Sequence, residues 1–379
     1  MSGSPPTPTQ SVFIARQNRL TTALAEAGLD ALALNPGPSL IYLTGLHFHL
    51  SERPVVTLFI PGKTPILVLP ELEMAKTRGL PFEMQAFPYG EDLESWPVVF
   101  RQATQAARID CHPVGVEPGR LRVLELRILE EAAPGARWVS AEASLAALRM
   151  RKDAGEIAAM RRAVDIAQRA LQATLPQLKI GMSEHELAAE LTLQILRAGS
   201  DPELPFAPIV SGGPNSANPH ASPSNRRLSP GDLLVIDWGA SNEGYFSDLT
   251  RTFAIGKVDA ELEQIARVVM QANAAGRAAG RPGVACGEVD RAARSVIEQA
   301  GYGQYFFHRT GHGLGMESHE EPYMRAGNPL LMEAGMTYTV EPGIYLPARN
   351  GVRIEDDVAV TADGSESLSD MPRELITIG

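Results

Sequence analysis

The sequence of 379 residues is poor in cysteine, in positive charge and in long apolar runs. Only Cys111 and Cys286 occur, far apart and without a CxxC pair, so we expect free thiols in a reducing compartment. The formal net charge of −11 disfavours nucleic acid or an anionic membrane as the main partner. No uncharged apolar run approaches the roughly 20 residues that span a bilayer. These absences predict a soluble, cytoplasmic protein.

Residues 1–10 are rich in proline, serine and threonine and lack a basic segment followed by an apolar one. We therefore interpret them as a flexible lead-in and not as a signal peptide. The chain is long enough for two domains with substantial cores. A helical pattern over 11–27 and a hairpin pattern of 55–60 with 66–69 open the first of these. We predict a small α/β domain over residues 11–148 and a second domain over 149–379.

An internal repeat organises the second domain. Residues 181–199 align without gaps to residues 283–301, and both copies are predicted to be capped helices that end in glycine. Each copy follows another long helical pattern, over 156–175 and 259–280, and precedes a histidine-bearing segment and a hairpin with acids. We predict two similar α/β halves, related by a pseudo-twofold axis, with the acids at their seam.

The acids occupy equivalent places in the two halves. Asp237 ends the apolar run 233–236, and Asp248 follows 11 residues later. Glu341 stands 104 residues after Asp237, and Glu355 follows it by 14 residues. Because side chains alternate along a strand, the four carboxylates can all face one side. Four converging carboxylates repel one another severely, and a pair of divalent cations relieves that repulsion.

Histidines cluster close to the second pair of acids. His308, His312 and His319 lie within 12 residues, in a glycine-rich segment that lets the backbone approach closely. This clustering, beside the independently inferred acids, indicates a metal site. Oxygen-rich ligation with one imidazole suits Mn²⁺, Co²⁺ or Zn²⁺ better than a metal that prefers thiolates.

These residues resemble the metallopeptidase family M24, whose pita-bread fold is shared by methionine aminopeptidase, creatinase, Xaa-Pro dipeptidase (prolidase) and aminopeptidase P. The resemblance covers the chain from about residue 150, and residues 11–148 resemble the creatinase/prolidase N-terminal domain. It implies a homodimer and two divalent metal ions per subunit, with manganese foremost and cobalt or zinc as alternatives. The implied metal ligands are Asp237, Asp248, His312, Glu341 and Glu355.

The resemblance also implies a division of labour among the acids. Asp248 and Glu355 correspond to the ligands that bridge both metals. Glu341 corresponds to the ligand that also acts as general base toward the hydroxide between the metals.

Further roles are implied for residues around these ligands. His220 corresponds to a substrate-binding histidine, and His319 to the one that steadies the tetrahedral intermediate. His308 matches a histidine near the proline subsite, with a catalytic and binding role. Arg353, two residues before Glu355, is expected to pair with a ligand beside the bound substrate.

A separate N-terminal domain argues against methionine aminopeptidase, and the complete ligand set argues against creatinase. We expect hydrolysis of the Xaa-Pro imide bond in dipeptides or short peptides, as by a prolidase. Removal of the first residue from longer peptides, as by aminopeptidase P, and metal-free peptide binding remain alternatives.

The preference for dipeptides depends on a cation that binds the substrate carboxylate. Some prolidases carry an arginine four residues after the histidine of the His-Glu motif, but this chain has Tyr323 there. Arg53, in a proline-punctuated loop of the first domain, is the expected replacement, and Arg325 is the fallback.

Overall fold

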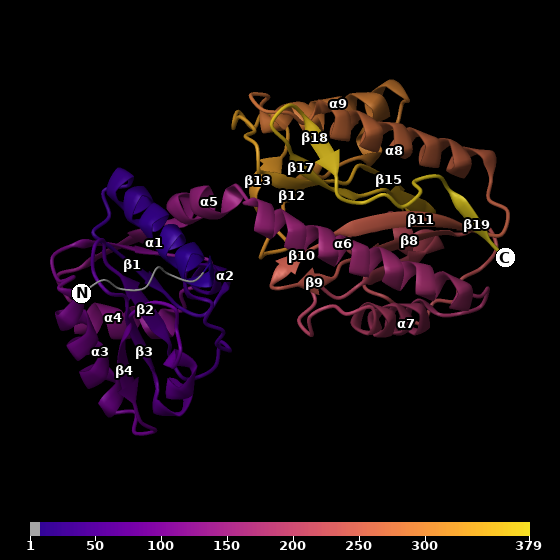
Figure 1. The fold of residues 1–379 in the computed structure, drawn as a ribbon. Coiled ribbons are helices and arrows are strands. Elements are labelled where there is room, and N and C mark those ends of the chain that lie inside the picture. The colour runs from indigo at the N-terminus through magenta and orange to yellow at the C-terminus, as the bar shows by residue number, and fades with distance from the viewer. Residues whose placement is uncertain (1–7) are drawn as a thin grey trace. The chain divides into compact units, whose positions relative to one another are not determined.

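The computed structural model describes residues 8–379, which divide into two compact units with a boundary after Arg149 (Figure 1). Most of the predicted flexible lead-in, residues 1–7, lies outside the described residues. Residues 8–10 belong to helix α1 (Pro8–Glu26), which therefore begins earlier than the predicted position 11. A proline is well tolerated at the first position of a helix, because its missing N–H would have no partner there.

The first unit is built on a six-stranded sheet of order β4-β3-β2-β1-β5-β6. Strand β2 is antiparallel to both β1 and β3, and the other neighbouring pairs are parallel. The predicted hairpin of 55–60 with 66–69 is confirmed as β2 and β3. The strands are β1 (Ala31–Leu34), β2 (Val56–Phe59), β3 (Ile66–Pro70), β4 (Gln85–Tyr89), β5 (Pro113–Val116) and β6 (Arg137–Ser140).

Helices α3 and α4 cover one face of this sheet. Phe100 of α3 and Leu129 of α4 pack in one buried cluster with Ala33, Leu58 and Val68 of the strands. Alternate residues of adjacent strands face these helices, as the twofold periodicity of a strand requires. The helices of this unit are α1, α2 (Pro38–Thr44), the 3₁₀ helix η1 (Glu71–Thr77), α3 (Ser95–Ala107), α4 (Val123–Ala132) and α5 (Glu142–Met150), the last of which ends just past the unit boundary.

The second unit pairs a sheet of order β19-β11-β8-β7 with a sheet of order β13-β12-β14-β17-β18. Its helices are α6 (Ala154–Thr174), η2 (Leu175–Gln177), α7 (Glu184–Arg197), η3 (Gly213–Ala217), α8 (Ala260–Ala279), α9 (Cys286–Gln299) and η4 (Gly303–Tyr305). The strands of the first half are β7 (Ile209–Gly212), β8 (Leu233–Trp238), β9 (Ser241–Asn242), β10 (Tyr245–Phe246) and β11 (Leu249–Ile255). The later strands are β12 (Gly311–Gly313), β13 (Glu320–Met324), β14 (Thr337–Val340), β15 (Gly343–Leu346), β16 (Asn350–Arg353), β17 (Asp356–Val360), β18 (Ser365–Ser367) and β19 (Ile376–Ile378).

The repeat seen in the sequence is also a repeat of structure. Helix pairs α6–α7 and α8–α9 each precede a strand trio, β7-β8-β11 in the first half and β12-β14-β17 in the second (Figure 1). Each trio carries one small inserted hairpin, β9/β10 or β15/β16. The predicted α/β class, with a duplicated second domain, is therefore confirmed.

The two repeat copies differ in how their helices begin. At α7, Ser183 Oγ accepts a bond from the Glu186 amide at 3.2 Å, and Glu186 accepts one from the Ser183 amide at 2.7 Å. At α9 the prediction was wrong for the N-terminal cap, because Ala285 precedes the helix and provides no side-chain cap, whereas the predicted glycine, Gly301, does follow the helix. Alanine has no acceptor with which to replace serine at this position. Among residues 8–379, no helix has both the length and the apolar character needed to cross a bilayer.

Candidate metal centre

Strand pairing brings acids from both halves of the second unit together. Antiparallel β8 and β11 place Asp237 opposite Thr250. Thr250 also pairs with Glu355 through an isolated antiparallel bridge between the two halves. Strand β17 begins directly after Glu355 and runs antiparallel to β14, which ends just before Glu341. The pairing of these strands thus places carboxylates from both halves at one seam.

The tightest group at this seam consists of Asp248, His312 and Glu355. One donor atom from each lies within 4.8 Å of the others, and all three side chains are buried. His312 Nε2 lies 3.8 Å from Asp248 Oδ2 and 3.3 Å from Glu341 Oε1. The charge of Asp237 raises the pKa of Asp248, Glu341 and Glu355, so Asp237 faces the same space. The structure brings the five predicted ligands together.

His312 presents a lone pair toward the acids. Its Nδ1 lies 3.1 Å from the Gly313 carbonyl, which can only accept, so Nδ1 carries the proton and Nε2 remains an acceptor. Burial, with the nearby His319, lowers the pKa of His312 well below its usual value. A neutral imidazole with an unprotonated Nε2 is the form that binds a divalent cation.

The buried acids repel one another. Burial raises the pKa of Asp237, Asp248, Glu341 and Glu355, in the case of Glu341 to about 7, and the neighbouring negative charges raise the pKa of the last three further. Asp237 Oδ1 is buried and finds no hydrogen-bond donor within residues 8–379. Divalent cations would give this oxygen a partner and neutralise the repulsion, so the donor set fits the predicted ions.

Arg353 and Thr250 hydrogen-bond to two of the clustered acids, Asp237 and Glu355. Arg353 Nη2 donates to Asp237 Oδ2 at 2.7 Å, and its Nε donates to Thr250 Oγ1 at 3.1 Å. Thr250 Oγ1 in turn donates to Glu355 Oε2 at 2.7 Å. Arg353 Nη1 donates to the Tyr345 hydroxyl at 3.1 Å. Buried polar chains of this kind fix the orientation of carboxylates before any ion binds.

His319 and His220 lie beside the cluster and are more exposed. The His319 ring is centred 4.0 Å from that of His312. Arg309 Nη2 lies 3.3 Å from His319 Nδ1; because a guanidinium only donates, Nδ1 accepts and the proton of His319 sits on Nε2. A charge on His220 lowers the pKa of both Asp237 and His319, which places this exposed side chain near them.

His308 is held by protein groups at both ring nitrogens. Nδ1 lies 2.7 Å from the Arg309 carbonyl, and Nε2 lies 2.9 Å from the Tyr345 hydroxyl. Nδ1 therefore donates and Nε2 accepts, so the ring is neutral in this arrangement. Burial lowers the pKa of His308 to about 4. Both ring nitrogens of His308 are therefore occupied by protein groups.

The depressed pKa of His308 predicts an acid-sensitive fold. The unfolded histidine takes up a proton near pH 6.5 and the folded one only near 4, so its contribution to stability is complete above 6.5 and is lost as the pH falls toward 4. Within that window, wild-type protein should lose about 1.4 kcal/mol of unfolding free energy per pH unit relative to His308→Gln, which does not titrate. Urea titrations from pH 7 to 4, with chelator in both samples, measure this. Parallel stability curves would contradict it.

Arg53 lies in the first unit, among carboxylates of that unit. Its Nη1 pairs with Glu52 at 2.8 Å and its Nη2 with Glu91 at 3.0 Å. To hold a substrate carboxylate, Arg53 would have to exchange these partners.

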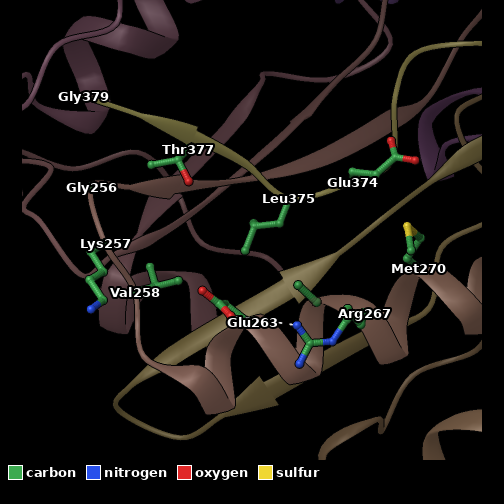
Figure 2. A pocket seen from close by; sticks show the side chains of 11 residues that line it. Gly256, Lys257, Val258, Glu263, Arg267, Met270, Glu374, Leu375, Thr377 and Gly379 are labelled. Carbon is green, nitrogen blue, oxygen red and sulfur yellow. Dashed lines mark ion pairs between the residues drawn. The ribbon is translucent and has the colours of Figure 1, made fainter.

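A pocket of about 610 Å³ lies apart from the five candidate metal ligands, where β19 and the segment after β11 approach α8 (Figure 2). Lys257, Glu263, Arg267 and Glu374 contribute charged groups to its wall, and Glu263 pairs with Arg267 at 3.9 Å. None of the predicted site residues lines this pocket. The candidate metal centre therefore rests on the buried donor atoms and not on the volume of a pocket.

Comparisons with known proteins agree with a metal-dependent hydrolase. The profile of the metallopeptidase family M24 matches residues 158–362, and that of the creatinase/prolidase N-terminal domain matches residues 16–151. An Xaa-Pro dipeptidase of Lactobacillus delbrueckii subsp. lactis is 31% identical over 360 residues, which cover 94% of this chain and 97% of the relative.

Solved structures are similar along nearly the whole chain. A recombinant prolidase from Thermococcus sibiricus superposes with a TM-score of 0.92 at 30% identity, covering 99% of this chain and 100% of that one. Dipeptidase PepE from Mycobacterium ulcerans gives a TM-score of 0.89 at 35% identity, with 98% and 99% covered. The fold and the site define a metallopeptidase, that is, a hydrolase. The chain belongs to metallopeptidase family M24, with a creatinase/prolidase N-terminal domain.

Proposed function

We propose that this chain hydrolyses the imide bond between a residue Xaa and proline, chiefly in dipeptides, as a dinuclear metal-dependent prolidase. The observation that carries the proposal is the convergence of five donors at the seam of the duplicated domain: Asp237, Asp248, His312, Glu341 and Glu355. The relatives named as prolidase and Xaa-Pro dipeptidase support this substrate class.

The five donors would hold two divalent ions, with Asp248 and Glu355 shared between them. Such a pair supplies a water of lowered pKa and polarises the scissile carbonyl. We propose manganese as the native ion, because a carboxylate-rich set with one imidazole suits it. The proposal includes a homodimer. Elemental analysis and light scattering of protein purified without added metal test both points.

The residues around the donors have distinct tasks in this mechanism. Glu341 would accept the proton of the attacking water and pass it to the proline nitrogen, which is the leaving group and departs only once it is protonated. His319, protonated at Nε2, donates to the oxyanion that develops on the scissile carbonyl. His220 binds the substrate beside it. Arg353 keeps Asp237 oriented, and His308 packs beside the proline ring.

Hydrolysis of Ala-Pro, Ala-Pro-Ala and Ala-Ala by manganese-loaded protein tests the proposal. We expect rapid release of proline from Ala-Pro, slow cleavage of the tripeptide and none of Ala-Ala. Faster cleavage of the tripeptide would indicate an aminopeptidase P, the alternative that the tyrosine at position 323 favours. Absence of both activity and bound metal would indicate a peptide-binding protein.

A further inference from the structure

Arg309 lies at the edge of the candidate metal centre, where it contacts His319 and Tyr323. It follows His308 directly and precedes His312 by three residues. Its Nη2 lies 3.3 Å from His319 Nδ1, and its guanidinium carbon lies 4.6 Å from the centre of the Tyr323 ring. The His319 ring in turn lies 4.0 Å from that of His312. One imidazole therefore separates the guanidinium from a candidate metal ligand.

Arg309 lacks an ion-pair partner in the part of the chain that the structure describes. Within residues 8–379, no carboxylate forms an ion pair with it, whereas Arg353 pairs with Asp237 and Arg53 pairs with Glu91. Its field reaches the centre, since it lowers the pKa of Glu341, among other groups. A partly buried guanidinium with spare donors beside a peptidase centre is suited to bind an anion.

The backbone around Arg309 is fixed on both sides. Arg294 donates to the His308 carbonyl at 2.7 Å, and Asp290 accepts from the Thr310 amide at 3.1 Å. Arg294 and Asp290 also pair with each other at 2.9 Å. Tyr323 belongs to β13, which is antiparallel to β12, and Arg309 lies in the segment two residues before β12. Stacking on this ring restricts the guanidinium before any ligand arrives.

We propose that Arg309 binds the carboxylate of the proline residue in the substrate and so selects dipeptides, an inference that rests on the proposed function. In an Xaa-Pro dipeptide, only the proline nitrogen and α-carbon separate that carboxylate from the scissile carbonyl. A cation one imidazole away from the metal ligands is therefore at the right place to receive it. In a longer peptide the same position holds a neutral amide, which cannot form a charge-assisted, two-pronged contact with a guanidinium.

The other arginines considered for this task are less suitably placed. Arg53 is engaged by Glu52 and Glu91 in the first unit. Arg325 is exposed and lies after the end of β13, past Tyr323. Tyr323 occupies the position of the arginine found in some prolidases, and here its ring packs against the Arg309 guanidinium.

The test compares Ala-Pro with its carboxamide, Ala-Pro-NH₂, which differs only in the group that Arg309 would bind. Glutamine keeps an N–H that can donate to His319 Nδ1 but loses the positive charge. For Arg309→Gln we therefore expect KM for Ala-Pro to rise about 10- to 100-fold, while KM for the amide changes little and any fall in kcat is small beside the rise in KM. Arg309→Lys should recover only part of the affinity, because lysine keeps the positive charge but cannot form the two parallel hydrogen bonds of a guanidinium. Arg291→Ala, which removes an exposed arginine that pairs with Glu288 on α9, is the matched control.

Each other result has a definite meaning. Equal losses of kcat on both substrates would show that Arg309 acts through His319 and would overturn the inference, as would unchanged kinetics. A KM rise confined to Arg53→Ala would also overturn it and assign the carboxylate to Arg53. If wild-type protein cleaved neither substrate, the proposed function itself would fall, and this inference with it. Thermal unfolding of each variant separates these outcomes from misfolding.

Discussion

Asp248→Ala and Glu355→Ala are each expected to abolish peptide hydrolysis and to leave the protein without either metal ion. Both side chains are buried at the tightest point of the cluster, with His312 between the two halves of the domain. If each is shared by two ions, its loss removes one ligand from both at once. We expect activity to fall by about 10³-fold or more, since metal assistance contributes several kcal/mol to the transition state.

Asp237→Ala is the matched comparison, because Asp237 is a buried acid of the same cluster assigned to one ion only. It should mainly empty one site, so elemental analysis should find about one ion per chain. Two retained ions with normal activity in Asp248→Ala would contradict the assignment of that residue as shared.

A stability measurement checks the same assignment without any activity assay. Added Mn²⁺ should raise the melting temperature of wild type, by the equivalent of about 2.7 kcal/mol at a hundredfold excess over Kd, and should have little effect on Asp248→Ala. With chelator present, the variant should be at least as stable as wild type, because one of several mutually repelling buried carboxylates is gone. A variant that unfolds early even in chelator would show damage to the fold instead of loss of metal.

The convergence of the acids could be predicted from the sequence because strand geometry leaves little choice. Asp237 directly follows a run of apolar residues, and Glu341 occupies the same place in a repeat, so each must lie at the end of a buried strand. The duplication then places the two strand ends next to each other at the seam between the halves. Thr250 hydrogen-bonds to both Glu355 and Arg353. It lies two residues after Asp248, so the alternation of side chains along a strand could have placed it on the same side as that acid.

Other features depend on contacts that sequence spacing does not encode. Strand β6 (Arg137–Ser140) and strand β4 (Gln85–Tyr89) lie at the edges of their sheet. Nearly all of their residues are exposed or only partly buried, so they lack the alternation that predicts a strand. Arg309 lies just before β12 and contacts Tyr323 of β13, and the pairing of these two strands shifts register between Gly311 and Gly313. An irregularity of this kind re-aims side chains, and no periodic pattern reveals it.

His319→Ala and His220→Ala should keep both metal ions and lose turnover. Neither side chain is in the group of mutually close donors, and both are more exposed than its members. The contact with Arg309 leaves the His319 proton on Nε2, available to a developing oxyanion. Donors that act on the transition state mainly lower kcat, by about 10²-fold for a single oxyanion contact, with KM little changed.

Two further variants make this prediction specific. His319→Gln retains an N–H donor and should recover part of the lost kcat, which a merely structural role for the ring would not predict. His185→Ala removes an exposed histidine at the start of α7 and should leave kcat unchanged. Turnover on Ala-Pro and metal content by elemental analysis are the two measurements. If His319→Ala or His220→Ala lost an ion, that histidine would belong among the ligands, and the oxyanion would need another donor.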